Sequence, residues 1–188
     1  MPIPAPLAPL AQYRQFIPVL VVPKEGKPGK TDKFPVDPFT GRVGVDAHDP
    51  RIWQSYDEAA TVAARFGSCG VVGFVLTRND PFFCLDIDGA ATAAGWSPTA
   101  ASLCSQLPGT AIEVSYSGVG LHIWGQGVVG EHAKKNIPLG IELYTELRFI
   151  ALGHSATGYA GVCPTLAQVA AAYFPAKIAD RSVPEEGP

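Results

Sequence analysis

Two carboxylates separated by a single residue are the side chains of this sequence best suited to chemistry. Asp86 and Asp88 end the apolar segment FFCLDIDG, residues 82–89. Because a β-strand sends alternate side chains to the same face, both carboxylates are expected on one face, with the alternating apolar residues in a core. Like charges this close repel unless a cation lies between them, and carboxylate oxygens suit Mg²⁺ or Mn²⁺. The pair predicts a divalent-metal site, and an ordinary Asp-Gly turn is the alternative.

A glycine-rich turn between two apolar segments carries a second group of polar residues. Residues 115–122 have the sequence SYSGVGLH. Two glycines in a tight turn expose backbone N–H groups that can bind an anion, while Ser117 adds a hydroxyl and His122 another donor. We therefore expect a triphosphate site here, with a common hairpin turn and a structural histidine as the alternative. The residues expected to bind the nucleotide are Ser117, Gly118, Gly120 and His122.

Glu142 is a carboxylate in the middle of an apolar strand. Such a carboxylate either faces solvent or joins a polar site, and strand alternation places it on the face opposite the core side chains. Glu146, in the following turn, is expected to point into solvent. Arg148 and His154 are candidates for phosphate contact, with ordinary surface positions as the alternative.

A lysine-rich segment precedes these motifs. Residues 24–42 carry four lysines and one arginine among glycines and prolines, without a helical or strand period. They are expected to form a long loop with a hairpin around residues 38–41. The lysines either keep the protein soluble or contact the phosphates of a template strand, and Lys30 and Lys33 are the candidates for that contact.

Composition limits the class of protein. The chain has 188 residues, of which 47% are hydrophobic and 16% charged, which is typical of one globular domain. Its four cysteines match no zinc or disulfide pattern. A net charge of -3 argues against coating nucleic acid by overall charge, but it allows a local basic patch. No apolar run reaches the roughly 18 residues that span a bilayer and no signal peptide is visible, so we expect a cytoplasmic protein without a membrane partner.

Apolar patterning and capping residues predict the elements that position these motifs. Strands are expected at residues 16–22, 71–76, 82–87, 111–116, 120–125, 140–144 and 147–152. Helices are expected at residues 56–66, 98–107 and 166–174. Ser55 with Glu58 and Thr165 with Gln168 form capping boxes that begin the first and last helix. The turn at residues 79–81 predicts that the strands on either side of it form an antiparallel pair.

The chain is expected to form one domain over residues 16–176. Residues 1–15 are rich in proline and alanine and predict an extended lead-in. Residues 177–188 predict a disordered tail or a linker to a further domain, and residues 130–138 predict a mobile loop.

Three of these motifs, in this order, resemble those of the archaeo-eukaryotic primase superfamily. More closely, the chain resembles the N-terminal primase-polymerase domain of phage and plasmid replication proteins. The motifs are DID at residues 86–88, SGVGLH at residues 117–122 and the strand acid of GIELY, Glu142. The resemblance also includes KTDKFPVDPFTGR, DPRIWQSYDEA, GFVLTRNDPFFCLDIDG and RFIAL, and so covers roughly residues 17–155.

This resemblance implies template-directed nucleotidyl transfer that makes or extends primers in phage or plasmid DNA replication, in the cytoplasm of a bacterial cell. It implies that Asp86, Asp88 and Glu142 hold two Mg²⁺ or Mn²⁺ ions. Ser117 and His122 would grip the phosphates of a nucleoside triphosphate. The implied partners are a single-stranded DNA template or primer-template and a fused or associated helicase.

The fold that the resemblance implies is α/β. Its core would be an RRM-like, mainly antiparallel sheet with flanking helices, and a small N-terminal α/β subdomain would complete the primase-polymerase catalytic fold. Such a sheet would place Glu142 across from Asp86 and Asp88.

Two alternatives come from other classes of protein. The segment LDIDG also resembles the nucleophile motif of haloacid-dehalogenase phosphatases, in which Asp86 would be phosphorylated. The sequence has no convincing GDxxxD or DD motif downstream, which that family needs. The second alternative is a catalytically silent nucleic-acid-binding module with the same fold. Nucleotide incorporation on a primed template distinguishes all three.

Overall fold

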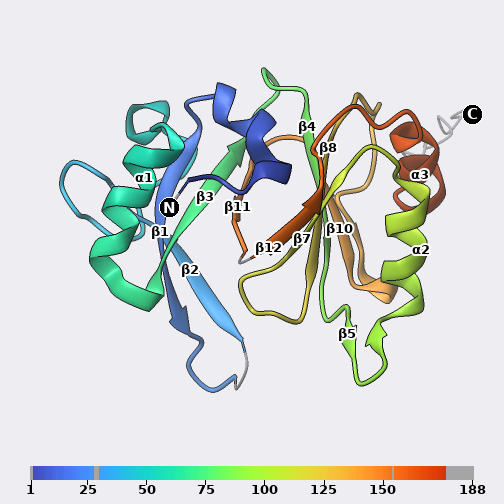
Figure 1. Ribbon diagram of the computed structural model, residues 1–188, viewed down its shortest axis with the longest axis horizontal. Coiled ribbons are helices and arrows are strands. Elements are labelled where there is room, and N and C mark those ends of the chain that lie inside the picture. Colours follow the sequence, from blue (N-terminus) through green and yellow to red (C-terminus); the bar gives the residue numbers. More distant parts are fainter. Residues whose placement is uncertain (1, 28–29, 154, 177–188) are drawn as a thin grey trace, which may run out of the picture.

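The computed structural model describes residues 2–27, 30–153 and 155–176. They form a mixed α/β structure built on antiparallel sheets, as the sequence predicted at this level. Figure 1 shows the two larger sheets side by side, with α2 and α3 on the outer face of the larger one. The candidate site residues lie on the strands of these two sheets or in the segments next to those strands.

The smaller of these two sheets has four strands in the order β11-β3-β1-β2, all antiparallel. Its strands are β1 (Phe16–Pro23), β2 (Thr31–Pro35), β3 (Gly70–Leu76) and β11 (Arg148–Ala151). The sequence predicted a loop where β2 lies, so that prediction is wrong for residues 31–35. An ion pair joins Lys24, which directly follows β1, to Asp32 of β2. The turn expected around residues 38–41 is present, because the Gly41 N–H donates to the Asp37 carbonyl.

The larger sheet has six antiparallel strands in the order β12-β7-β8-β4-β10-β9. Its strands are β4 (Phe82–Ile87), β7 (Ala111–Val114), β8 (Leu121–Gln126), β9 (Lys135–Asn136), β10 (Ile141–Tyr144) and β12 (Ser155–Gly158). A two-stranded ribbon, β5 (Ala91–Thr92) and β6 (Gly95–Trp96), follows β4. Since β9 lies within residues 130–138, the mobile loop expected there includes a short paired strand.

One face of the larger sheet is sealed by helices. Phe83, Leu85 and Ile87 of β4 pack in one cluster with Leu103 of α2 (Pro98–Gln106) and Val169 of α3 (Leu166–Tyr173). The other face meets the smaller sheet, where the ring of Phe74 lies 5.8 Å from Phe82 and 6.0 Å from Trp124. Asp86, which alternates with Leu85 and Ile87, therefore points between the two sheets.

The predicted pairing of β3 with β4 is wrong, because the two strands belong to different sheets. The turn between them leads the chain from the smaller sheet into the larger one instead of folding it back along β3. Its shape depends on the Asp80 carboxylate, which accepts hydrogen bonds from the Thr77 N–H and hydroxyl, from the Phe82 N–H and from the Gln15 side chain. The chain crosses between the same two sheets again at residues 145–147, between β10 and β11.

The first predicted capping box is confirmed and the last is wrong. Ser55 and Glu58 exchange both capping bonds at the start of α1 (Tyr56–Ala63), which continues as the 3-10 helix η3 (Ala64–Cys69). Thr165 makes no such bond, because its hydroxyl donates to the Gln106 carbonyl and ties α3 to the end of α2. Two further 3-10 helices are η2 (Pro50–Ile52) and η4 (Ile137–Leu139).

The N-terminal segment is also more ordered than the sequence predicted. Residues 5–12 form the 3-10 helix η1 (Ala5–Gln12) instead of an extended lead-in, because Leu7 and Leu10 are fully buried in the core. Figure 1 shows η1 near the junction of the two sheets. The predicted tail at residues 177–188 lies outside the described residues. Within the described part of the chain, no helix has the length and apolar character needed to cross a membrane.

Replacing Asp80 with alanine is expected to lower the free energy of unfolding by about 2 kcal/mol, because partly buried donors would lose their acceptor. Asp37 is the matched control: its carboxylate accepts bonds from Phe39 and Thr40 in an exposed turn, where water can replace it. Asp37→Ala should cost less than about 1 kcal/mol. Urea unfolding of both variants measures the difference, and equal losses would contradict the structural role given to Asp80.

Candidate active site

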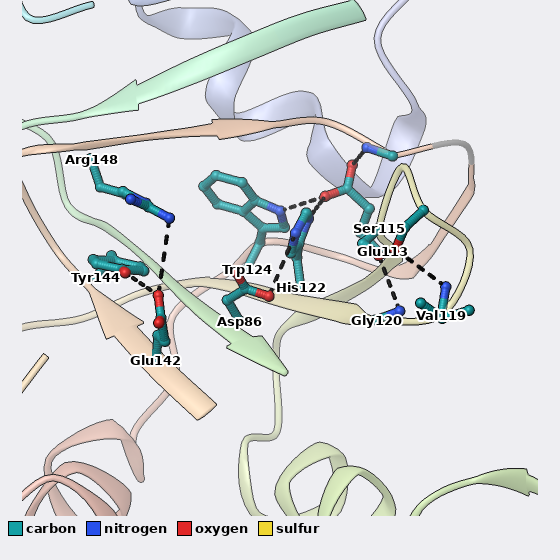
Figure 2. Close-up of polar contacts among 12 residues, drawn as sticks. Asp86, Glu113, Ser115, Val119, Gly120, His122, Trp124, Glu142, Tyr144 and Arg148 are labelled. Atoms are coloured by element: carbon teal, nitrogen blue, oxygen red, sulfur yellow. Dashed lines mark hydrogen bonds and ion pairs between the residues drawn. The ribbon is translucent and has the colours of Figure 1, made fainter. Parts of the chain in front are cut away.

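A row of polar side chains crosses the larger sheet. The register pairs Glu142 with Asp86, Asp86 with His122, and His122 with Glu113, on the neighbouring strands β10, β4, β8 and β7. Lys135 of β9 extends the row beyond Glu142. Residues directly opposite each other lie on the same face of a sheet, so all five side chains share the face toward the smaller sheet. Figure 2 shows four of them, with His122 between Asp86 and Glu113.

A cavity of about 340 Å³ lies over the acidic part of this row. The larger sheet contributes Asp86, Asp88, His122 and Glu142 to its wall. The smaller sheet contributes residues of β2 and β11, including Lys33 and Arg148. The carboxylates of the larger sheet thus face Lys33 and Arg148, while Asp32 on the same wall as these two cations is paired with Lys24. This pattern suits a ligand that carries both phosphate groups and cations.

The surroundings of Asp86 disfavour its ionised form. Its side chain is 20% exposed, and this burial raises the pKa of Asp86 above its usual range. The neighbouring His122 and Lys33 oppose that shift, while the negative charges of Asp88 and Glu142 add to it. Asp88 itself is exposed beyond the end of β4, where its N–H donates to the Gly140 carbonyl. A cation beside Asp86 would relieve both its burial and its repulsion.

Glu142 lies opposite Asp86, as predicted, but it is already engaged. It accepts hydrogen bonds from the Lys135 ammonium and the Tyr144 hydroxyl, and the Arg148 guanidinium lies 4.0 Å away. Burial alone would raise the pKa of Glu142, but the hydrogen bonds from Lys135 and Tyr144 outweigh it and hold the pKa below its usual value. Glu142 is therefore stabilised as a carboxylate.

His122 and Glu113 form the buried end of the row. His122 is 2% exposed, with Nδ1 at 2.7 Å from Glu113 Oε2 and Nε2 at 3.8 Å from Asp86 Oδ1. The same Glu113 oxygen accepts a bond from Trp124 Nε1 at 2.9 Å. The sequence analysis missed Glu113. The pattern that identified Glu142, a carboxylate inside an apolar strand, also marks Glu113 in the segment AIEV.

The glycine-rich turn does not offer the free N–H groups that the sequence predicted. The Gly118 N–H donates to the Ser115 carbonyl, the Gly120 N–H to Ser115 Oγ at 3.1 Å, and the Val119 N–H to Ser117 Oγ at 3.5 Å. Ser115 therefore accepts the hydrogen bonds of both glycine N–H groups of the turn, and Figure 2 shows the one from Gly120. Ser117 is exposed and does not line the cavity, in contrast to His122. A role for the turn in binding phosphate stays a prediction.

The structure separates the two candidate lysines. Lys33 lies on β2 and lines the cavity, whereas Lys30 precedes β2 and does not. Arg148 also lines the cavity, and its guanidinium lies over the Tyr144 ring, 4.7 Å from the ring centre. His154 lies outside the described residues.

The ligand types at the cavity fit a hard divalent cation. Asp86, Asp88 and Glu142 all present carboxylate oxygens, which Mg²⁺ and Mn²⁺ prefer. Among the described residues, no three His, Cys, Asp or Glu side chains form a ready-made metal cluster. The hydrogen bonds of Glu142 to Lys135 and Tyr144 are one physical reason, since they direct its oxygens toward those side chains.

The chain is similar to a curated phage protein. In an alignment of 161 residues that covers 81% of this chain, the chain is 30% identical to a protein of Nitratiruptor phage NrS-1 named DNA primase-polymerase. The predicted resemblance to phage primase-polymerases is confirmed. The chain spans about 20% of the length of that primase-polymerase. No protein-family model matches the chain.

The opposite pKa shifts of Asp86 and Glu142 predict opposite pH dependences of metal-free stability. Folding raises the pKa of Asp86, so this residue lowers the free energy of unfolding as pH rises from about 3.9 through the higher folded pKa. Over that pH range the free energy of unfolding of Asp86→Asn should increase relative to that of wild type. Glu142, with its pKa lowered, contributes stability above about 4.3 that is lost as pH falls through the lower folded value.

Glu142→Gln should therefore be less stable than wild type at pH 7, and the difference should shrink in acid. Each unit of pKa shift corresponds to about 1.4 kcal/mol. Urea unfolding between pH 3 and 7 with a chelator measures both differences. Two variants with the same sign of pH dependence would contradict the electrostatics described for this cavity.

Proposed function

We propose that this chain catalyses template-directed nucleotidyl transfer, as a primase, a polymerase or both. The observation that carries the proposal is the direct pairing of Glu142 with Asp86 across β10 and β4, over a cavity that Asp88 also lines. The named activity of the phage relative supports the same class of reaction. The comparison does not favour the phosphatase alternative.

Asp86, Asp88 and Glu142 are the residues that would hold two Mg²⁺ or Mn²⁺ ions. When bound, such ions activate the attacking 3′-hydroxyl and neutralise the departing pyrophosphate. Glu142 would exchange its bond from Lys135 for the cation, which leaves the Lys135 ammonium free at the rim. Lys33 and Arg148, on the opposite wall, would bind the phosphates of the nucleoside triphosphate or of the template. His122, whose Nε2 faces the cavity, would contact the triphosphate.

The same proposal extends to the fold and the setting. The larger sheet, with α2 and α3 on one face and the polar row on the other, would be the RRM-like core of a primase-polymerase fold. The smaller sheet with α1 would be the N-terminal subdomain, completed by β11 from later in the chain. We propose a role in phage or plasmid DNA replication, in a bacterial cytoplasm, on a single-stranded or primed DNA template and with a fused or associated helicase.

Glu142→Gln is expected to reduce nucleotide incorporation on a primed template by about 100-fold or more, because it removes a charged metal ligand while keeping the shape. Glu146→Gln is the control. Glu146 does not simply point into solvent, as the sequence predicted, but is partly buried and lies 3.4 Å from the exposed Arg78. An ion pair this open to solvent contributes little. Its incorporation rate should stay within about twofold of wild type.

The same assay distinguishes the alternatives. Loss of incorporation in Glu146→Gln but not in Glu142→Gln would overturn the assignment of the third acid. Hydrolysis of p-nitrophenyl phosphate without incorporation would favour a phosphatase. Template binding without either reaction would favour a silent nucleic-acid-binding module.

Lys33→Ala is expected to lower the magnitude of the salt dependence of single-stranded DNA binding, log K against log [salt], by about 0.7, the value for one lost phosphate contact. Lys30→Ala is the matched control, because Lys30 does not line the cavity. Fluorescence anisotropy at several salt concentrations gives both slopes. An unchanged slope in Lys33→Ala would show that Lys33 does not contact the template.

A further inference from the structure

The proposed reaction leaves one buried charged group without a role. Glu113 of β7 is 1% exposed, at the end of the polar row away from Glu142. A buried carboxylate is costly unless hydrogen bonds replace its water. Three donors reach Glu113: His122 Nδ1 at 2.7 Å and Trp124 Nε1 at 2.9 Å meet Oε2, and the Gly153 N–H meets Oε1 at 2.7 Å. The carboxylate is thus well satisfied and rigidly held.

These contacts decide which nitrogen of His122 carries a proton. The indole of Trp124 and the backbone N–H of Gly153 are donors only, so both carboxylate oxygens of Glu113 act as acceptors. At 2.7 Å from one of these oxygens, an unprotonated Nδ1 would place a lone pair against another lone pair. With Glu113 ionised, the state that three converging donors favour, Nδ1 carries the proton and donates a hydrogen bond to Oε2.

The same contact fixes the direction of the other ring nitrogen. His122 Nε2 lies 3.8 Å from Asp86 Oδ1 on the side of the cavity, which is beyond a direct hydrogen bond. Because the ring is 2% exposed and packed between strands, it cannot turn without breaking the bond to Glu113. Figure 2 shows Glu113 and Asp86 on opposite sides of the imidazole.

We propose that Glu113 is a positioning residue that orients His122, so that Nε2 faces the Asp86 cavity and, in the doubly protonated ring, donates a hydrogen bond to a phosphate oxygen of a nucleoside triphosphate. The ligand in this statement rests on the proposed function. The orientation of the ring does not, and it can be tested in the free protein. Carboxylates that hold the far nitrogen of a functional histidine typically change affinity or activity by 10- to 100-fold when removed.

The first test is the protonation of the His122 ring in the free wild-type protein. Long-range ¹H–¹⁵N spectra of histidine-labelled protein report each ring nitrogen, and the chain has four histidines, so His122→Gln assigns the signal. Nδ1 is expected to be protonated and in a single form. An unprotonated Nδ1 would overturn the proposal, and this measurement needs no variant of Glu113.

The second test compares two changes to the same hydrogen-bond network. Glu113→Gln keeps the shape of the side chain but offers one acceptor oxygen and one donor NH₂ group to the same three donors. Where the NH₂ group meets Nδ1, Nδ1 must accept, so a fraction of His122 should become unprotonated at Nδ1. Trp124→Phe is the matched control, because it removes a different donor and leaves the bond between Glu113 and His122 in place. It should keep the wild-type His122 signal. Equal disturbance in both variants would show that Glu113 has only a structural role.

The third test is the binding of dATP with Mn²⁺, measured by calorimetry. Glu113→Gln is expected to weaken binding about 10- to 100-fold. Because Glu113 acts through His122, the double variant with His122→Ala should bind no more weakly than His122→Ala alone. Additive losses would overturn the positioning role. A wild-type protein that incorporates no nucleotide would instead overturn the proposed function, while the ring protonation would still decide the role of Glu113.

Discussion

The register of β4 between β8 and β10 is the constraint on which the candidate site depends. A shift of one residue would turn every side chain of β4 to the opposite face. Leu85 and Ile87 prevent such a shift, because they are buried under α2 and α3 and would have to exchange places with Asp86. Burying two such side chains is worth roughly 3–6 kcal/mol, more than a surface ion pair provides. Apolar packing on one face therefore decides where the charges lie on the other.

The carboxylates of the polar row are stabilised to different degrees, and the difference indicates their roles. Glu113 is fully hydrogen-bonded and closed to solvent, as expected of a group that holds another side chain in place. Glu142 is stabilised by the buried Tyr144 and by Lys135, whose side chain is exposed, so that a ligand can compete with Lys135. Asp86 is the one whose pKa is raised, because the effect of burial exceeds the opposing charges of His122 and Lys33. The interaction with Asp86 would therefore contribute most to the free energy of cation binding, and displacing Lys135 from Glu142 would cost least.

Local signals in the sequence predicted the elements but not how they are shared between sheets. Most strands, the capping box at Ser55 and the face on which Glu142 lies follow from alternation and capping, which act over a few residues. The position of Glu142 opposite Asp86 was implied by the family resemblance. The separation of β3 from β4 depends on Asp80, whose bond to Gln15 spans 65 residues. Such a contact leaves no local pattern. The role of Ser115 in satisfying the glycine-rich turn was missed for a related reason, since either serine in SYSG could have served.

The two walls of the cavity come from different sheets, yet a short stretch of chain connects them. Glu142 is on β10 and Arg148 begins β11, with the crossing at residues 145–147 between them. Glu146 in that crossing pairs with Arg78 in the other one, but Arg78 is exposed, Glu146 is only partly buried and the distance is 3.4 Å. The edge-to-face contacts of Phe74 with Phe82 and Trp124 are buried and join the sheets directly. Aromatic packing, rather than the ion pair, therefore holds the acidic and basic walls at a fixed separation.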